Sequence, residues 1–431
     1  MNGFSDSEEP PSRRFWRDAS EEEWRNWKWQ LKNRIRTFEQ LERLLPFTED
    51  ETERIKRTIA TYHVSIPPYY FSLINPDDLN DPVRLQAVPV PEEIELKNGE
   101  DDPLDERDDS PVRGLTHRYP DRVLMYIASF CPVYCRHCTR KREWLEGEYQ
   151  RPKEEIDRML AYIREHEEIR DVIISGGDPL AAPLHRMEYI LQNLRAIPHL
   201  DIIRIGSRVP VFLPMRINEE LTSVLEKYGP IWINTHFNHP NEITPYSEEA
   251  VLRLLKAGCP VSNQAVLLKG VNDDLETMKR LLRGLLKIRV RPYYIFHCDP
   301  VNGAAHFRTS VWKGIEIMEG LRGHISGLAI PTYVVDAPGG GGKIPLMPNY
   351  LLSASEDAVI LRNYEGVIVK YDPDGRIGKN KNGNHHKNGK YRNGGYYIEA
   401  VPVGISGLLE SDETSLIPRD LPRAQRRRTA L

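Results

Sequence analysis

The chain has 431 residues, of which 40% are hydrophobic and 28% are charged, and its formal net charge is −4 at pH 7. This length predicts two or three domains, or one large barrel with additions. Because the charge balance offers no attraction to nucleic acid or to an anionic membrane, we expect neither as a partner and favour a small-molecule substrate.

The apolar runs are too short to cross a membrane. The longest, VLMYIASF at 123–130, falls far below the roughly 20 residues that a membrane-spanning helix needs. The N-terminal stretch MNGFSDSEEPPSRRF lacks the apolar core of a secretion signal, so we expect a cytoplasmic protein. The five cysteines, an odd number in so long a chain, argue against a disulfide framework. In a reducing compartment a tight cysteine cluster indicates metal binding or redox chemistry.

Residues 1–110 predict a helical N-terminal region followed by a connector. Two capping-box signatures, Ser20 with Glu23 and Thr48 with Glu51, mark helix starts. The segment 66–121 is rich in proline and acidic residues, which predicts an irregular connector that wraps the next domain. Apolar side chains at helical spacing predict one helix packing face, made of Trp24, Trp27, Leu31, Ile35, Phe38, Leu41 and Leu45.

Residues 111–345 carry the pattern of an α/β barrel. Short apolar, β-forming runs alternate with amphipathic segments at a pitch of about 30 residues, which is typical of parallel strands joined by helices. Six such units predict a partial (β/α)6 barrel, with the site in the loops at the carboxyl ends of the strands. The expected strands are 123–129, 171–175, 201–206, 231–235, 261–268 and 293–297, with a seventh at 330–335.

The C-terminal segment, residues 346–431, is less regular. Its stretch 378–395 consists almost wholly of Gly, Asn, Lys and His, a composition that cannot bury a core and predicts a mobile loop. His385 and His386 could bind a metal, but we favour solvated loop histidines because no cysteine or third histidine lies nearby in the sequence.

Three of the five cysteines fall within eight positions, directly after the first barrel strand. Cys131, Cys135 and Cys138 can converge on one inorganic cluster, whereas a structural zinc or a four-cysteine cluster would need a fourth ligand. Cys259 and Cys298 lie on distant strands and are expected to be small buried hydrophobes. Three ligands leave one iron open to a chelating molecule. This spacing after a first barrel strand resembles the radical S-adenosylmethionine superfamily.

A second motif, DAPGGGGK, runs from Asp336 to Lys343. It is not a phosphate-binding Walker loop, because Ala337 stands where the motif needs Gly and Ile344 where it needs Ser or Thr. A flexible linker is the alternative. A lysine at the end of four glycines can approach a planar cofactor closely, which fits a Schiff-base lysine for pyridoxal phosphate.

Together these motifs resemble the lysine 2,3-aminomutase family, radical enzymes that use both S-adenosylmethionine and pyridoxal phosphate. The resemblance implies a radical S-adenosylmethionine partial barrel, a [4Fe-4S] cluster on the three cysteines, and pyridoxal phosphate on Lys343. It implies interconversion of L-lysine and L-β-lysine, a reduced flavodoxin or ferredoxin as electron donor, and a homo-oligomer, either a dimer or a tetramer. It runs from about Trp24 to Tyr371 through LTHRYPDRVL, CRHCTRKR, SGGDPL, GSRVPV, NTHFNHP, NQAVLLKGVND, RPYYIFHCD, HFRT, GIEIMEGLRGH and VVDAPGGGGK.

The resemblance also assigns roles to residues that, taken singly, would be interpreted as surface charges, strand-end caps or satisfied buried polar groups. Arg118 and Arg122 would hold the phosphate of pyridoxal phosphate, and Arg140 the substrate α-carboxylate. Asp299 and Asp336 would face the substrate's side-chain ammonium, because an ammonium removed from water needs paired negative charge. The implied contacts to S-adenosylmethionine are Gly176, Gly177, Asp178, His236 and Gln264.

The sequence departs from the family pattern in one respect. Well-known members bind a structural zinc through C-terminal cysteines, but this chain has no cysteine after Cys298, and Asp274 stands where a fourth ligand is expected. We therefore expect no structural zinc. The alternatives are a glutamate 2,3-aminomutase, an aminomutase that modifies a translation elongation factor, and a non-catalytic iron-sulfur electron carrier or sensor.

Overall fold

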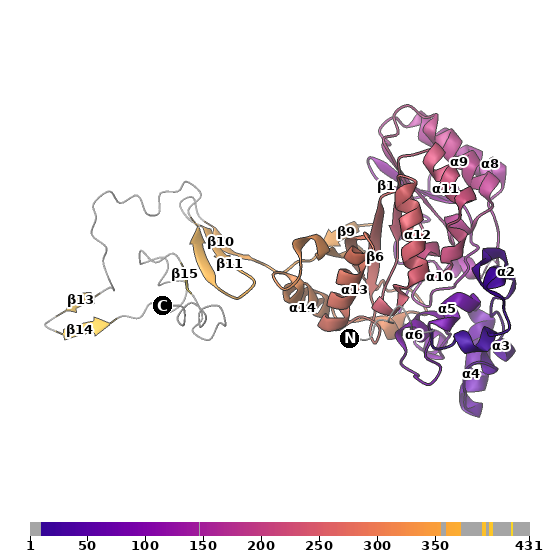
Figure 1. Cartoon of the computed structure of the whole chain (residues 1–431). Coiled ribbons are helices and arrows are strands. Elements are labelled where there is room, and N and C mark those ends of the chain that lie inside the picture. The colour runs from indigo at the N-terminus through magenta and orange to yellow at the C-terminus, as the bar shows by residue number, and fades with distance from the viewer. Residues whose placement is uncertain are drawn as a thin grey trace. The chain divides into compact units, whose positions relative to one another are not determined.

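The computed structural model describes residues 10–145, 147–354 and 359–371, and the strand backbones at 390–393, 396–399 and 415–416. The chain divides into two compact units, Met1–Leu346 and Met347–Leu431 (Figure 1). None of the described helices is long and apolar enough to cross a bilayer.

The N-terminal region contains several short helices where the sequence predicted one packing face. Both predicted capping boxes form, at Ser20 and at Thr48, but Asn26 accepts two backbone N–H bonds and starts a new helix directly after the first. Ile35 then pairs with Ile66 as a β-bridge instead of continuing a helix. The elements are η1 (Arg13–Trp16), α1 (Glu21–Arg25), α2 (Trp27–Lys32), α3 (Phe38–Glu42) and α4 (Glu49–Thr61).

The segment 66–121 is more regular than the predicted connector. Two of its prolines, Pro68 and Pro82, begin helices, because proline lacks the N–H that a first helical residue leaves unbonded. The sequence-based interpretation of this segment as an irregular connector had included no helix. The elements are α5 (Pro68–Ser72), α6 (Pro82–Ala87), α7 (Glu92–Glu95) and the strand β1 (Leu115–Tyr119).

The first unit is built on a nine-stranded sheet whose strands follow one another in sequence order. Seven are parallel: β2 (Arg122–Tyr126), β3 (Asp171–Ser175), β4 (Ile202–Gly206), β5 (Ile231–Thr235), β6 (Val261–Leu267), β7 (Arg291–His297) and β8 (Thr332–Ala337). The antiparallel edges are β1 and β9 (Gly342–Pro345), neither of which was predicted. Such a sheet is a partial (β/α)6 barrel, as predicted.

Six longer helices join the seven parallel strands. Figure 1 shows α8, α9, α11 and α12 along the sheet, with α2 to α6 gathered near one of its ends. The helices are α8 (Lys153–Glu165), α9 (Leu184–Arg195), α11 (Glu219–Lys227), α12 (Pro245–Lys256), α13 (Leu275–Lys287) and α14 (Val311–Leu321). Shorter turns are η2 (Lys141–Trp144), η3 (Pro179–Ala181), α10 (Val209–Phe212), η4 (Pro214–Arg216), η5 (Pro240–Glu242), η6 (Ala305–Phe307) and η7 (Gly327–Ala329).

The two faces of the parallel strands differ in burial. Successive side chains of a strand point to opposite faces, and one set is fully buried against the helices, where each aliphatic side chain contributes roughly 1.5 to 3 kcal/mol. The other set is mostly half-buried and faces a cavity, so the barrel interior is hollow. The buried set includes Val123, Met125, Val172, Ile174, Ile203 and Ile205, and the cavity set Leu124, Ile173, Arg204, Gln264, Tyr294 and Phe296.

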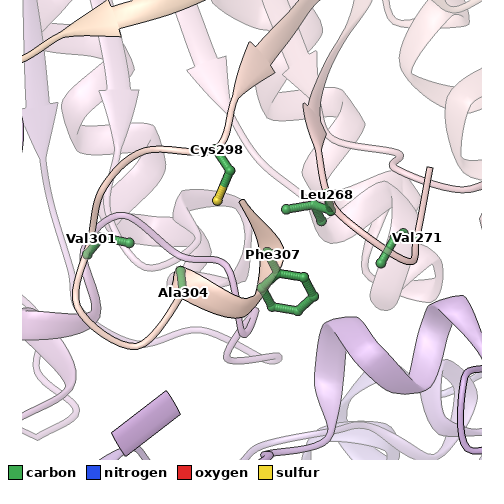
Figure 2. Close-up of a cluster of buried hydrophobic side chains, with 6 residues drawn as sticks. All are labelled: Leu268, Val271, Cys298, Val301, Ala304 and Phe307. Carbon is green, nitrogen blue, oxygen red and sulfur yellow. The ribbon is translucent and has the colours of Figure 1, made fainter. Parts of the chain in front are cut away.

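An apolar cluster joins the loops that follow β6 and β7. Figure 2 shows Cys298 and Leu268, each just past a strand, directed into the same space as Phe307. Cys259 and Cys298 are 1% and 2% exposed, which confirms the prediction that both are buried. Because Cys298 is anchored here, the neighbouring Asp299 is held at the mouth of β7. The cluster consists of Leu268, Val271, Cys298, Val301, Ala304 and Phe307.

The second unit contains a four-stranded antiparallel sheet, in the order β10, β11, β12 and β15. Most of the predicted loop 378–395, with His385 and His386, lies outside the described residues. The strands are β10 (Leu351–Ala354), β11 (Val359–Arg362), β12 (Ile368–Tyr371) and β15 (Ser415–Leu416), with a separate hairpin of β13 (Lys390–Asn393) and β14 (Tyr396–Glu399).

Candidate functional site

One cavity of about 530 Å³ collects every site residue that the sequence predicted. It extends from the loops at the carboxyl ends of the strands into the hollow interior, as far as Arg122 and Asp171 at the opposite strand ends. The strand pattern had placed the site in those loops, whereas the resemblance had added Arg118 and Arg122 before the first strand and Gln264 within a strand. The predicted residues in its wall are Cys131, Cys135, Cys138, Arg118, Arg122, Arg140, Gly176, Gly177, Asp178, His236, Gln264, Asp299, Asp336 and Lys343.

The three cysteines lie in the loop that follows β2, and all three are free thiols. Burial raises the pKa of the Cys131 and Cys138 thiols, so a cationic group in their midst would be needed to hold them as thiolates. Across the described part of the chain, no three His, Cys, Asp or Glu side chains converge as ligands of a single ion. Soft thiol ligands spaced in this way fit an iron-sulfur cluster better than one metal ion.

Basic side chains within and just after the cysteine loop are buried and paired with acids from the N-terminal region. Glu93 on α7 receives Arg136 Nη2 and Lys141 Nζ, both at 2.6 Å, and all three side chains are at most 1% exposed. Burial alone would raise the pKa of Glu93, but the two cations lower it to about 2. Ser65 Oγ donates to the carbonyl oxygen of Pro132 at 2.6 Å. The N-terminal region therefore braces the cysteine loop.

The turn after β3 approaches this loop closely. The Gly177 N–H donates to the carbonyl oxygen of Ala128 at 2.5 Å, and a Cβ at Gly177 would collide with the carbonyl oxygens of Ser129 and Phe130. Glycine is thus required for the approach. The Asp178 carboxylate accepts bonds from Ser207 Oγ and the Arg208 N–H, both at 2.7 Å, so it ties the turn to the loop after β4.

Two residues that line the cavity near β5 carry polar atoms without partners in the described part of the chain. Thr235 Oγ1 and His236 Nε2 are buried with no hydrogen-bond partner among the described residues. Burial lowers the pKa of His236 to about 3, so the ring is neutral. Since unsatisfied buried polar groups are costly, these atoms fit a polar ligand such as S-adenosylmethionine. Gln264, on β6, lines the same wall.

Lys343 lies in a β-hairpin of β8 and β9, and not in a flexible linker, which was the alternative interpretation of the glycine run. Gly339, Gly340 and Gly342 have positive φ values of 67°, 70° and 76° and form the turn, which L-residues with side chains disfavour. Strand β9 then pairs Lys343 directly with Asp336 on β8, and Lys343 Nζ lies 3.3 Å from both carboxylate oxygens.

Two arginines of the β1–β2 hairpin share the wall with Lys343. Arg118 Nε donates to Asp109 Oδ2 at 2.7 Å, and its Nη2 donates to the carbonyl oxygen of Leu104. The Arg122 guanidinium lies 4.0 Å from the centre of the Tyr119 ring. A reactive lysine, two guanidinium groups and flat aromatic rings suit the charge and shape of pyridoxal phosphate, so the residues present fit this cofactor.

The carboxylates at the strand ends are inequivalent. Asp299 Oδ2 accepts a hydrogen bond from Thr139 Oγ1 at 3.0 Å. Burial, and then the neighbouring Asp336, raise the pKa of Asp299 to about 7. Arg140, which follows Thr139 in the chain, also lines the cavity, and Glu106 receives its Nη2 at 2.5 Å and its Nε at 2.9 Å.

The sequence interpretation missed the groups that hold the predicted residues in place, chiefly Glu93, Glu106, Thr139 and Arg208. The basic run at 140–142 offered a signal, because buried cations require acids and the preceding connector is unusually acidic. Asp274, which stands at the expected zinc position, is the N-cap of α13 and accepts the N–H of Thr277 at 2.9 Å.

Comparisons with known proteins match both units. The family model "Radical SAM superfamily" covers residues 125–282, and "Lysine-2,3-aminomutase" covers residues 318–431. A putative L-lysine 2,3-aminomutase of Aquifex aeolicus is 56% identical over 84% of this chain and 98% of its own length. The L-lysine 2,3-aminomutase of Clostridium subterminale is 50% identical over 96% of this chain and 97% of its own length. The glutamate 2,3-aminomutase of Clostridioides difficile is 47% identical over 83% of this chain and 85% of its own length.

The matches cover the cysteine loop, the barrel and the C-terminal unit, and the match to the Clostridium subterminale enzyme extends over nearly the full length of both chains. They agree with the partial (β/α)6 barrel and with the free thiols that line its cavity. The chain therefore belongs to the lysine 2,3-aminomutase family of the radical S-adenosylmethionine superfamily.

Proposed function

We propose that this protein interconverts L-lysine and L-β-lysine by migration of the amino group from carbon 2 to carbon 3. The observation that carries the proposal is that three free thiols, Lys343 and the carboxylates of Asp299 and Asp336 line one cavity. Each relative that the comparisons name as a lysine 2,3-aminomutase supports the same activity.

Cys131, Cys135 and Cys138 would hold a [4Fe-4S] cluster, and Lys343, Arg118 and Arg122 would hold pyridoxal phosphate. When bound, the cluster with S-adenosylmethionine supplies a hydrogen-abstracting radical, and pyridoxal phosphate supplies the conjugated system across which nitrogen migrates. Contacts to S-adenosylmethionine would come from Gly176, Gly177, Asp178, His236 and Gln264. A one-electron donor such as reduced flavodoxin or ferredoxin is also required.

The chain's own residues would bind and orient the amino acid. Arg140 would donate to the α-carboxylate, since Glu106 fixes its guanidinium edge and leaves Nη1 facing Ser175 at 3.4 Å in the cavity wall. Asp299 and Asp336 would pair with the side-chain ammonium. With the cofactors bound, the barrel walls would shield the reacting atoms from water, which protects a radical from quenching.

The alternatives fit the cavity less well. A glutamate substrate would bring a side-chain carboxylate toward Asp299 and Asp336, and like charges in a buried site repel. An electron carrier or sensor would have no use for a lysine and two phosphate-suited arginines beside its cluster. These features favour lysine over glutamate and catalysis over electron transfer.

The test is an anaerobic assay of protein reconstituted with iron, sulfide, S-adenosylmethionine, pyridoxal phosphate and a reductant. Incubated with L-lysine or L-glutamate, the protein is expected to form β-lysine and to leave glutamate unchanged, as measured by chromatography of the amino acids. Turnover of glutamate as fast as lysine, or no turnover by protein with a full cluster, would refute the proposed function.

A further inference from the structure

A buried arginine contacts one of the three cysteines directly. Arg208 follows β4, and its side chain is 6% exposed. Its Nη1 donates to Cys135 Sγ at 2.8 Å, and its Nε donates to the carbonyl oxygen of His236 at 2.8 Å. Its Nη2 donates to Glu242 Oε1 and to Gln86 Oε1, both at 2.6 Å. The direction of the N–H toward sulfur is therefore set by bonds at the other nitrogen atoms.

The acceptors around Arg208 are themselves held in place. Glu242 is fully buried, and its Oε2 accepts the N–H groups of Asn238 and His239 at 2.7 and 2.9 Å. Tyr70 Oη donates to Glu242 Oε1 at 2.6 Å. Rotation of the guanidinium would leave several buried polar atoms unsatisfied, which is unfavourable. The contact between Arg208 and Cys135 is thus fixed by the hydrogen bonds that surround the guanidinium.

The charge of Arg208 is balanced by Glu242, so the pair adds little net charge beside the cysteine loop. The remaining interaction is one directed, charge-assisted hydrogen bond from the Arg208 N–H to the Cys135 sulfur. Arg34 offers a contrast, because it is also buried near this loop, at 9% side-chain exposure, but donates to Ser65 Oγ at 3.3 Å and lies over the Phe130 ring at 5.0 Å. Of these two buried arginines, Arg208 donates a hydrogen bond to a cysteine of the loop, whereas Arg34 donates to Ser65.

We propose that Arg208 is a positioning residue that raises the reduction potential of the cluster through its hydrogen bond to Cys135. Hydrogen bonds to ligand sulfurs are among the factors that set such potentials. Were the oxidised cluster to take one electron from a one-electron carrier, the added negative charge on the sulfurs would strengthen the N–H···S hydrogen bond that Arg208 already makes to Cys135. No bond of Arg208 breaks. The inference rests on the proposed cluster site.

The first experiment needs no variant. Wild-type protein labelled with guanidino-15N arginine is reconstituted, reduced without S-adenosylmethionine, and examined by pulsed electron paramagnetic resonance. A 15N coupling to the reduced cluster is expected, and it should disappear in Arg208→Lys, whose side chain carries no guanidinium. A fully loaded wild-type cluster without 15N coupling would overturn the inference.

The second experiment measures the midpoint potential of the cluster, again without S-adenosylmethionine. In Arg208→Gln the ratio of reduced to oxidised cluster at a fixed potential should fall at least about tenfold, which is about 59 mV for a one-electron couple. Arg34→Gln is the matched control and should shift this ratio much less. Equal shifts in both variants would overturn the inference, because a general effect of losing a buried cation would explain them.

Two further outcomes are also decisive. If Arg208→Gln does not retain its iron, the wild-type 15N spectrum and the cluster potential of Arg208→Lys take its place. These two measurements then decide whether Arg208 is hydrogen-bonded to the cluster sulfur. If iron analysis shows that wild-type protein itself binds no cluster, the proposed function and the role of Arg208 both fail, whereas a loaded cluster without the 15N coupling overturns the role of Arg208 alone.

Discussion

Replacing Asp299 with Asn tests how the cavity would recognise a lysine side chain. Asp336 is already paired with Lys343, whose Nζ lies 3.3 Å from both of its carboxylate oxygens. The Asp299 carboxylate, by contrast, takes its one hydrogen bond within the described residues from Thr139 Oγ1. Asp299 is therefore the carboxylate more free to receive the substrate ammonium, and its replacement leaves the Asp336–Lys343 pair untouched.

The magnitude follows from burial. Removing one partner of a buried charge pair costs about 3 to 5 kcal/mol, and the lower value corresponds to about a 150-fold rise in KM for lysine. The pH profile supplies a second signature, since the pKa of Asp299 is raised to about 7. Below that pH the carboxyl is increasingly protonated and cannot pair with ammonium, so KM should rise by up to about tenfold per pH unit. Asp299→Asn should lack this dependence.

The assay is β-lysine formation by reconstituted protein from about pH 6 to about pH 9, with lysine concentration varied at each pH. Asp50→Asn, at a side chain that is 80% exposed on α4, is the control and should match wild type. The cofactor absorbance and iron content of Asp299→Asn should stay normal. A KM within about threefold of wild type, or an unchanged pH profile in the variant, would show that Asp299 does not receive the ammonium.

Two further variants and one labelling experiment test other parts of the site. Cys135→Ala should lose the cluster and all turnover, as measured by iron analysis, and a variant that kept both would contradict the ligand assignment. Borohydride reduction of the holoenzyme, followed by peptide mapping, should find the pyridoxyl group on Lys343 and on no other lysine. Glu93→Gln leaves Arg136 and Lys141 as unpaired buried cations, which should lower the unfolding free energy by about 3 to 5 kcal/mol in urea denaturation of cluster-free protein. A loss below about 1 kcal/mol would mean that solvent reaches these cations.

Local patterns determined the elements of this protein and the chemistry of its motifs. Alternating apolar runs predicted all seven parallel strands to within about three residues at either end, because strand burial and helix amphipathicity are properties of short windows. Three cysteines in eight positions indicated a cluster for the same reason: the ligands come from one loop. The sequence could not indicate that Asn26 starts a new helix in the predicted packing face, or that Pro68 and Pro82 begin helices, because caps and breakers use the same residue types.

Only the tertiary structure decided what surrounds the motifs. The β8–β9 hairpin places Lys343 opposite Asp336, a pairing that the glycine run alone could not indicate. Glu93, Glu106 and Arg208 reach the cysteine loop or its basic run from segments far away in the chain. No short window contains such a contact, because the pairing of a buried charge depends on which segments the barrel brings together. Local sequence therefore determines which residue types occupy the site. The partners of these residues depend on how the barrel brings strands and loops together, and so do the pKa of Asp299 and the environment of Cys135.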